Sequence, residues 1–354
     1  MKTVTQHLLR EQMASQARLL GFDDIGYCSV EPFEQWLEHA YNPIAKRVAH
    51  DPRMLMSDAR TIVVAVKKYQ VFGPWPEGSA EVANYYLNSN TGFAEIKKLG
   101  AVLTDAGWQA MVSPSLPAKQ AAVRAGLGVQ GMNTQFCHRE FGLLVSLHLI
   151  LTDAPLAEAD SPYAICEMCG SCEAACPTGA VSASGFDHQK CLRFHMAGGS
   201  VVPDWAREAM GMRLIGCTDC QHACPNANKH IEPVPQALAE ATEIGGLLRG
   251  DKEQIEKLGA FIGKNFAHPR RIRQQAAICA GNSGNQSYVP DLIALLGNDD
   301  PVLRTHAAWA LGRLGGEAAE RALAEAAPGE ENPDVKKEML QALAALGVGT
   351  PLSE

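Results

Sequence analysis

The sequence predicts a multidomain protein of the α/β plus α class, with an α/β domain, a cysteine-rich domain and a helical repeat domain in that order. Its 354 residues are enough for two or three domains with buried cores. Eight of the eleven cysteines fall between residues 166 and 224, and the chain after Pro235 is rich in Ala, Leu and Gly at helical spacing. We expect the domains to span residues 1–155, 156–232 and 233–354.

Composition and charge narrow the class of protein further. Hydrophobic residues make up 46% of the chain and charged residues 20%, which is typical of a globular fold and excludes a disordered polyelectrolyte. The net charge of -8 excludes a global basic field that would attract nucleic acid or membrane. The most apolar stretch, 141–151, is about half the length of a membrane span, and the N-terminus lacks a signal-peptide pattern. We therefore expect a cytoplasmic protein with no membrane partner.

The first 155 residues have the alternating periodicities of an α/β domain. A loop is expected at 73–80, where two Pro and two Gly occur. Helices are expected at 5–20, 33–39 and 92–106, and strands at 25–30, 61–69, 108–112 and 141–151.

The C-terminal segment contains an internal repeat. Pro269, Pro301 and Pro333 are each 32 residues apart, and each is followed by a basic residue and an Ala-rich apolar helix. This pattern predicts an α-solenoid of helix pairs, similar to short HEAT repeats, although HEAT units are usually about 40 to 47 residues long. An ordinary helical bundle is the alternative.

The middle cysteines form two motifs that end in Cys-Pro. Residues 166–177 have the pattern C-x2-C-x2-C-x3-C-P, and residues 217–225 have C-x2-C-x3-C-P, with Cys191 between them. In bacterial ferredoxins the fourth cysteine of such a run binds the other cluster. The spacing therefore predicts two 4Fe-4S clusters, the first held by Cys166, Cys169, Cys172 and Cys224, and the second by Cys176, Cys191, Cys217 and Cys220. A pair of zinc sites is the alternative, because four-cysteine zinc sites also use C-x2-C pairs.

Two other features lie outside this pattern. Cys28, Cys137 and Cys279 are interpreted as buried structural thiols. Gly126, Gly128 and Gly131 spell the dinucleotide fingerprint G-x-G-x-x-G, with Asp153 downstream. However, AKQAAVRA before Gly126 predicts a helix where the fingerprint needs a strand, so a glycine-rich helix terminus is favoured over nicotinamide binding.

The motifs AVRAGLGVQGMNT, CEMCGSCEAACPTGAV, DHQKC and GCTDCQHACP, followed by the HEAT-like tail, occur in the order seen in epoxyqueuosine reductases. This resemblance covers nearly the whole chain. It implies a cobalamin-binding α/β domain, a bacterial ferredoxin-like domain and a repeat domain that helps to hold tRNA. It also implies that electrons pass through the clusters to cobalt and that epoxyqueuosine in tRNA becomes queuosine. A low-potential donor such as flavodoxin or ferredoxin and a monomeric state are expected.

The resemblance implies cobalamin-binding positions, and the chain departs from the family beside several of them. Arg47 resembles a family arginine near the corrinoid, whereas Ser113 stands near the position of the family's proton-donating aspartate. A hydroxyl is a poor general acid near neutral pH. Asn133 lies in G-M-N rather than G-K-N, Arg193 follows Cys191 where small hydroxyl residues are expected, and NSNTGF replaces an aspartate-tyrosine-histidine motif. The cofactor-binding candidates are Arg47, Ser113, Asn133 and Arg193.

Four side chains are candidates to replace the missing acid, and each also has a structural interpretation. Imidazole in general titrates near working pH, which makes His138 and His195 candidates, but a core or solvated histidine is the favoured interpretation of each. Tyr85 and Tyr86 could donate a proton, as a tyrosine does in reductive dehalogenases, but an aromatic pair packed beside a strand is the favoured interpretation.

A local basic cluster is the candidate tRNA contact. Residues 231–354 contain 12 Lys and Arg against 17 Asp and Glu, so phosphate binding there requires local concentration of positive charge. Such a concentration occurs in the segment GKNFAHPRRIRQQ, which contains Lys264, Arg270, Arg271 and Arg273. A solvated helix face explains this cluster equally well.

Three hypotheses follow from the sequence. The first is an iron–sulfur and cobalamin reductase that acts on epoxyqueuosine in tRNA. The second is a divergent relative with the same cofactors and a different substrate, such as a small molecule or a corrinoid protein, which the replaced aspartate favours. The third is a non-catalytic electron-transfer module whose repeats bind a protein partner.

Overall fold

The computed structural model describes residues 6–34, 48–89, 91–157, 160–162, 164–227 and 230–347. The chain divides into two compact units that interleave along the sequence. The first unit contains Met1–Val71, Asn88–His188 and Thr218–His230, and the second contains Phe72–Leu87, Gln189–Cys217 and Ile231–Glu354. The three-domain division remains a prediction.

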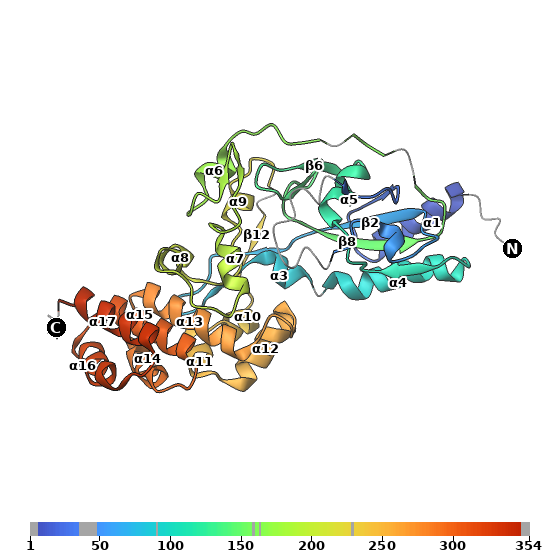
Figure 1. Cartoon of the computed structure of the whole chain (residues 1–354). Coiled ribbons are helices and arrows are strands. Elements are labelled where there is room, and N and C mark those ends of the chain that lie inside the picture. The colour runs from blue at the N-terminus through green and yellow to red at the C-terminus, as the bar shows by residue number, and fades with distance from the viewer. Residues whose placement is uncertain are drawn as a thin grey trace. The chain divides into compact units, whose positions relative to one another are not determined.

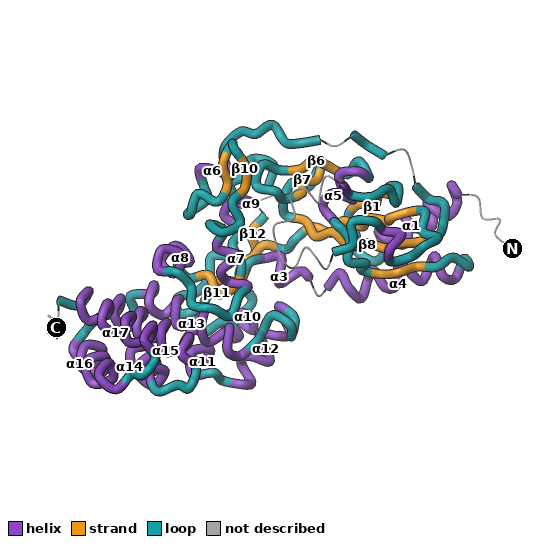
Figure 2. Tube along the Cα trace, in the orientation of Figure 1, coloured by secondary structure: helices purple, strands orange, loops and turns teal. Residues whose placement is uncertain are grey.

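The first unit is built on a four-stranded antiparallel sheet with strand order β1-β2-β8-β5 (Figures 1 and 2). β2 pairs over its whole length with β8, from Thr61 opposite Thr152 to Lys68 opposite Val145. Helices α1 and α4 contact one face of this sheet and α5 contacts the other. The strands are β1 (Asp24–Cys28), β2 (Thr61–Lys68), β5 (Ala110–Val112) and β8 (Val145–Thr152); the helices are α1 (Gln6–Leu19), α4 (Thr91–Asp105), α5 (Ala118–Arg124) and the short 3-10 turn η2 (Pro52–Met54).

The alternation of side chains along β2 explains why this sheet is buried on both faces. Ile62, Val64 and Val66 pack into the core under α5, whereas Val63 and Ala65 pack into the core under α1 and α4. Apolar residues on both faces of a central strand produce a continuous hydrophobic run, and this run is the strand signal of TIVVAV.

The cysteine-rich part of the first unit consists of short elements. A hairpin of β6 and β7 precedes β8 in the chain, and α6 and α9 pack against each other. The elements are β6 (Gly128–Gln130), β7 (Phe136–His138), α6 (Ser171–Ala174), β9 (Val181–Ser182), β10 (Gly185–Phe186) and α9 (Asp219–His222). β3 (Val71–Phe72) and α3 (Asn84–Ser89) fall at the boundaries between the two units.

The second unit is a stack of helices with one continuous apolar core. Within it, α13, α15 and α17 pack successively side by side, and α14 and α16 pack against α15 and α17 respectively. The elements are β4 (Glu81–Val82), α7 (Leu192–Ala197), α8 (Asp204–Met210), β11 (Arg213–Ile215), β12 (Ile231–Glu232), α10 (Gln236–Ala241), α11 (Ile244–Arg249), α12 (Lys252–Ile262), α13 (Pro269–Ser283), η3 (Gln286–Tyr288), α14 (Val289–Leu296), α15 (Pro301–Leu314), α16 (Glu317–Ala326), η4 (Ala327–Gly329) and α17 (Pro333–Ala345).

Several predicted elements are confirmed. α13, α15 and α17 begin at Pro269, Pro301 and Pro333, the three prolines of the repeat. The predicted helices at 5–20 and 92–106 correspond to α1 and α4, and the predicted strand at 61–69 to β2. The strand expected at 141–151 begins later, at Val145, because Gly142 turns the chain with a φ of 69°. The helix expected at 33–39 lies mostly outside the described residues. In the described part of the chain, no helix combines the length and hydropathy needed to cross a membrane.

Candidate metal centre

Two short helices place the cysteines of the two motifs in equivalent positions. α6 and α9 each carry a motif cysteine at their second residue, Cys172 and Cys220, and each is followed by Cys-Pro. Gly170 precedes α6 with a φ of 80°, a conformation that glycine adopts without steric cost. The C-x2-C-x3-C-P spacing therefore folds locally as one helical turn with a cysteine inside it and a cysteine after it.

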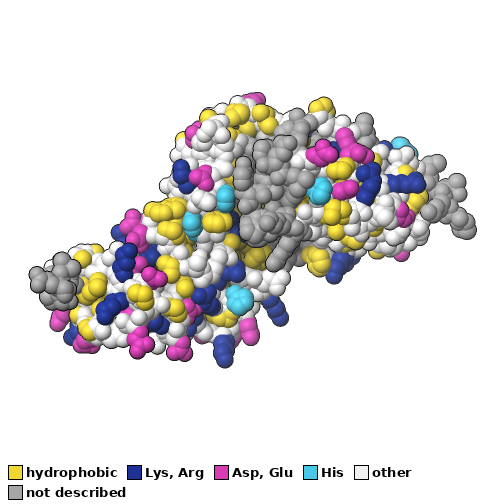
Figure 3. Space-filling model, in the orientation of Figure 1, with side chains coloured by type: hydrophobic (Ala, Val, Ile, Leu, Met, Phe, Trp, Pro, Cys, Tyr) yellow, Lys and Arg dark blue, Asp and Glu magenta, His cyan; other side chains and the backbone are white. Residues whose placement is uncertain are grey.

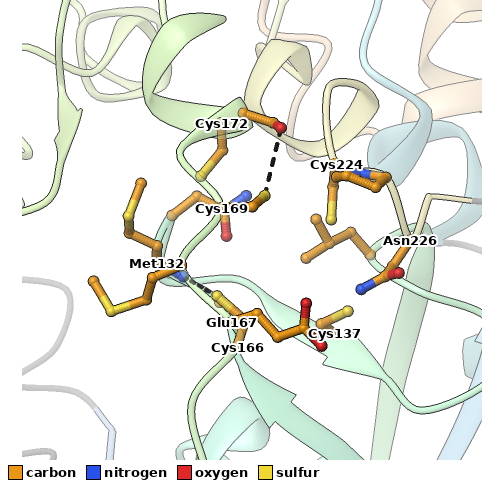
Figure 4. A pocket seen from close by; sticks show the side chains of 14 residues that line it. Met132, Cys137, Cys166, Glu167, Cys169, Cys172, Cys224 and Asn226 are labelled. Atoms are coloured by element: carbon orange, nitrogen blue, oxygen red, sulfur yellow. Dashed lines mark hydrogen bonds between the residues drawn. The ribbon is translucent and has the colours of Figure 1, made fainter.

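The four predicted ligands of the first cluster line one cavity of about 90 Å³ in the first unit. Figure 4 shows Cys166, Cys169, Cys172 and Cys224 around this common space. Cys166, Cys169 and Cys172 come from the chain before and within α6, and Cys224 comes from the chain after α9, 52 residues beyond Cys172. The structure thus brings together the crossed ligand set that the ferredoxin pattern predicts.

Hydrogen bonds reach the sulfurs of Cys166 and Cys169, whereas burial raises the pKa of the Cys172 thiol. The backbone N–H of Met132 donates to the Cys166 sulfur at 3.3 Å. The Cys169 sulfur lies 3.4 Å from the Ser171 hydroxyl, and this hydrogen bond lowers the pKa of the exposed Cys169 thiol. A lowered pKa favours the thiolate, the form that binds iron, and hydrogen bonds to cluster sulfurs are one control on reduction potential.

The predicted ligands of the second cluster are divided between the two units. Cys176 and Cys220 belong to the first unit, whereas Cys191 and Cys217 belong to the second. Burial acts to raise the pKa of Cys176, but hydrogen bonds from Thr178 and from the backbone of Val181 and Ala180 lower it overall. The N–H of Ala180 donates to the Cys176 sulfur at 3.2 Å. The second ligand set stays a prediction.

The three glycines of G-x-G-x-x-G serve the β6–β7 hairpin. α5 precedes them and β6 follows, the reverse of the strand-then-helix order of a dinucleotide site. Gly126 has a φ of 72°, and a Cβ on Gly128 would lie 2.1 Å from the Cys137 carbonyl oxygen. These glycines permit a helix terminus and a close backbone approach, as the sequence favoured.

The cofactor-binding candidates have different surroundings. Ser113 is exposed just after β5, with a φ of 53°, and its N–H donates to the Leu149 carbonyl. Asn133 is buried, and its amide donates to the Cys220 carbonyl at 3.1 Å while accepting from the N–H of Gln135. In the second unit, Arg193 lies over the Tyr86 ring, 5.6 Å from its centroid. Arg47 lies outside the described residues.

The described residues with positive φ other than glycine are Ser113, Thr134 and Met168. All three lie near candidate site residues: Ser113 is itself a candidate, Thr134 follows Asn133, and Met168 lies between Cys166 and Cys169. Strained backbone of this kind concentrates at functional sites.

The two candidate histidines are both held by hydrogen bonds. The Nδ1 atom of buried His138 accepts hydrogen bonds from the N–H groups of Glu140 and Phe141. The ring N–H is therefore at Nε2, which donates a hydrogen bond to the Asp24 carboxylate at 3.1 Å. The Nε2 atom of His195 lies 2.7 Å from the Gln189 carbonyl oxygen and donates to it. These contacts give both side chains a structural role.

The two candidate tyrosines are packed in the second unit. A Cβ on Gly216 would lie 2.3 Å from the Tyr85 hydroxyl, so this hydroxyl sits directly against the Gly216 backbone. Burial raises the pKa of Tyr85, and burial also raises the pKa of Tyr86 although Arg193 and Arg271 oppose it. A raised pKa holds the proton more tightly.

The four basic candidates for tRNA contact differ in exposure and in internal partners. Arg270 pairs with Asp300 and donates to the Gly199 carbonyl at 2.7 Å, and Arg273 donates to the Leu248 carbonyl at 3.2 Å. Lys264 is exposed, and Arg271 is half-buried near Tyr86. On the face that Figure 3 presents, basic and acidic side chains are interspersed over the repeat helices.

Cys28 and Cys279 are buried in apolar cores, and burial raises the pKa of Cys28 to about 12. Sequence reasoning grouped Cys137 with them, yet Cys137 also lines the cavity of the first cluster. The sequence analysis also missed Lys119. The Lys119 ammonium donates to the Thr134 carbonyl at 2.8 Å, and burial lowers its pKa although Cys220 acts in the opposite direction. No spacing in the sequence indicates that Cys137 lies at this cavity or that Lys119 contacts the Thr134 carbonyl, because both are tertiary contacts.

Comparison with known proteins agrees with this architecture. Residues 165–227 match the 4Fe-4S double cluster binding domain, and residues 255–344 match the HEAT repeats. The first match contradicts the zinc alternative, and the second contradicts the ordinary bundle. The fold and site thus define a two-cluster iron–sulfur protein that carries HEAT repeats.

Full-length relatives identify the family. The chain is 27% identical to the epoxyqueuosine reductase of Bacillus anthracis, over 96% of this chain and 97% of the relative. It is 28% identical to that of Bacillus subtilis over 94% of both chains, and 34% identical to an uncharacterised protein of Geobacillus stearothermophilus over 58% of this chain and 99% of the relative. The chain belongs to the epoxyqueuosine reductase family.

Solved structures share the fold. An epoxyqueuosine reductase bound to an epoxyqueuosine-modified tRNA-Tyr stem loop matches with a TM-score of 0.85 at 22% identity, covering 97% of this chain and 100% of that one. A structure of the Bacillus subtilis enzyme, with its catalytic aspartate loop swung out of the active site, matches with a TM-score of 0.84 at 23% identity and the same coverage.

Proposed function

We propose that this chain is an epoxyqueuosine reductase, which reduces epoxyqueuosine in tRNA to queuosine. The observation that carries the proposal is the near-complete coverage by epoxyqueuosine reductases, combined with four predicted cluster ligands that line one cavity. Two 4Fe-4S clusters, held by the motif cysteines, would relay electrons to cobalamin, the cofactor that the family resemblance implies. Cobalamin supplies low-potential cobalt chemistry that no amino-acid side chain provides.

The protein's own residues bind and orient these groups. Cys166, Cys169, Cys172 and Cys224 fit the first cluster because all four face one cavity. Cys176, Cys191, Cys217 and Cys220 are proposed for the second. Asn133 ties the hairpin loop to the second motif, since its amide donates to the Cys220 carbonyl. Arg47, Ser113 and Arg193 are the remaining candidates for contact with cobalamin.

The proton source differs from the family's pattern. Ser113 occupies the position near which the family has its aspartate, and a serine hydroxyl is far too weakly acidic to donate at neutral pH. Because Ser113 is exposed, water can reach this position. We infer that a water molecule beside Ser113 delivers the proton and that the Ser113 hydroxyl orients this water by hydrogen bonding.

The proposed partners follow from the same reasoning. The tRNA substrate requires phosphate contacts, for which Lys264 and Arg271 are the stronger candidates because Arg270 and Arg273 already donate to main-chain carbonyls. A low-potential donor, flavodoxin or ferredoxin, supplies the electrons. The working unit is a monomer.

The experiment that tests this function is complementation in a bacterium that lacks its own epoxyqueuosine reductase. Bulk tRNA is digested, and the ratio of queuosine to epoxyqueuosine is measured by mass spectrometry. The intact chain is expected to convert most epoxyqueuosine, and Cys166→Ala to convert none. Ser113→Ala is expected to slow the conversion several-fold without abolishing it. Persistence of epoxyqueuosine with soluble, iron-loaded protein would contradict the proposal.

A second candidate function rests on one specific observation, the serine in place of the acid. A divergent reductase with the same cofactors would act on a small molecule or a corrinoid protein. It would leave epoxyqueuosine unchanged in the complementation test, and Ser113→Asp would then create activity toward tRNA.

A further inference from the structure

The cavity of the first cluster is lined by five cysteines, although a 4Fe-4S cluster needs four thiolates. The fifth is Cys137, which lies at the centre of β7 and is 6% exposed. Figure 4 shows Cys137 beside the predicted ligands, next to Asn226. No motif spacing includes this residue, so its place in the cavity is a property of the fold alone.

Close backbone contacts at two glycines hold β7, one to the chain after Cys224 and one to β6. A Cβ on Gly142 would lie 1.6 Å from the Asn226 carbonyl oxygen, so the chain just after Cys224 touches the backbone at the end of the hairpin. A Cβ on Gly128 would lie 2.1 Å from the carbonyl oxygen of Cys137 itself. Close backbone packing on both sides therefore fixes Cys137 against the loop that carries Cys224.

The side chains around Cys137 place it at the end of the cavity that carries Cys224. The Asn226 and Cys224 side chains lie within hydrogen-bonding reach of the Cys137 thiol, and the Cys137 sulfur lies 3.9 Å from the His138 carbonyl oxygen. Cys137 thus neighbours the ligand from the second motif.

We propose that Cys137 is a reserve ligand of the first cluster, which binds the iron normally held by Cys224 when the Cys224 sulfur is absent. The replacement is a ligand exchange and not a redox step. The Cys137 S–H bond breaks, its proton passes to solvent, and the sulfur forms a bond to iron with no change in electron count. This inference does not depend on the substrate of the enzyme.

The test uses the full-length protein, reconstituted anaerobically with iron and sulfide. Cys224→Ala is expected to keep two four-iron clusters, about eight irons per chain. Cys137→Ala/Cys224→Ala is expected to contain a three-iron first cluster, seen by electron paramagnetic resonance as the signal of an oxidised 3Fe-4S centre. Cys137→Ala alone is expected to keep both four-iron clusters.

Cys169→Ala is the matched control. It also removes one ligand of the first cluster, but from the exposed edge of the cavity, so the three-iron signal is expected even though Cys137 is present. Cys224→Val, which also leaves no ligating atom, serves as a second background if Cys224→Ala does not accumulate, and there too removal of Cys137 should produce the three-iron form. A three-iron or iron-free first cluster in both Cys224 variants with Cys137 intact would overturn the proposal, as would failure of both variants to accumulate.

Discussion

At the scale of single residues, glycines and amide groups decide how closely the parts of the cluster site approach. Gly142 allows contact with the Asn226 backbone, and Asn133 ties its own loop to the Cys220 carbonyl. The N–H of Met132 points at the Cys166 sulfur. The site is therefore shaped by backbone contacts as much as by the cysteines.

Gly142→Ala tests this directly. Both Gly142 and Gly284 have a φ of 69°, so alanine at either position carries about 1–2 kcal/mol of backbone strain. Alanine at position 142 also brings a steric clash, because its Cβ would lie 1.6 Å from the Asn226 carbonyl oxygen. A Cβ at position 284 has nothing within 4 Å. Gly142→Ala is expected to lower both the melting temperature and the iron content, whereas Gly284→Ala lowers the melting temperature slightly. Equal iron content in the two variants would contradict the account.

The residues of the site differ in how far sequence could predict them. The ligand set proposed for the first cluster was predicted from the spacing of the two cysteine motifs, and its four members line one cavity. The approach of Cys137 and Lys119 could not be predicted, because it depends on how a hairpin and α5 pack against distant loops. Local patterns encode local geometry, and tertiary contacts leave no fixed spacing.

At the scale of elements, the repeat helices begin where the sequence places a polar residue before proline. Asn332 caps α17 by accepting from the N–H groups of Asp334 and Val335, and Asp300 caps α15 by accepting from Val302. His268 stands at the same position before α13 but makes no side-chain cap. The period of 32 residues was therefore sufficient to predict the three helix starts.

Asn332→Ala is expected to destabilise the repeat unit by about 1 kcal/mol, because two N–H groups lose their acceptor. The matched change His268→Ala is expected to alter stability by less than about 0.5 kcal/mol. Urea unfolding followed by far-ultraviolet circular dichroism measures both. Equal destabilisation by the two substitutions would show that the cap does not contribute.

At the scale of the whole molecule, the segment between Cys191 and Cys217 belongs to the repeat unit. Arg207 on α8 is 2% exposed and forms a two-point ion pair with Glu338 on α17, at 2.8 and 3.1 Å. Two predicted cluster ligands thus flank a segment anchored to the last repeat helix. The sequence could not reveal this anchoring, because Arg207 and Glu338 are 131 residues apart.

Glu338→Ala is expected to cost about 3 kcal/mol, because it leaves the buried Arg207 guanidinium without its main partner. The exposed pair Arg313–Glu208, at 3.2 Å, is the control, and Glu208→Ala is expected to cost less than about 1 kcal/mol. The urea midpoint of the helical transition measures the difference. A similar midpoint for the two variants would refute the anchoring role.

The most direct measurement of the central claim is anaerobic turnover by the purified holoenzyme. Protein containing both clusters and cobalamin is mixed with a low-potential reductant and tRNA carrying epoxyqueuosine, and the nucleosides are quantified by mass spectrometry. The account predicts queuosine in multiple-turnover yield, lost when Cys166 is replaced by alanine. Absence of queuosine from protein with confirmed cobalt and about eight irons would contradict it and favour a different substrate.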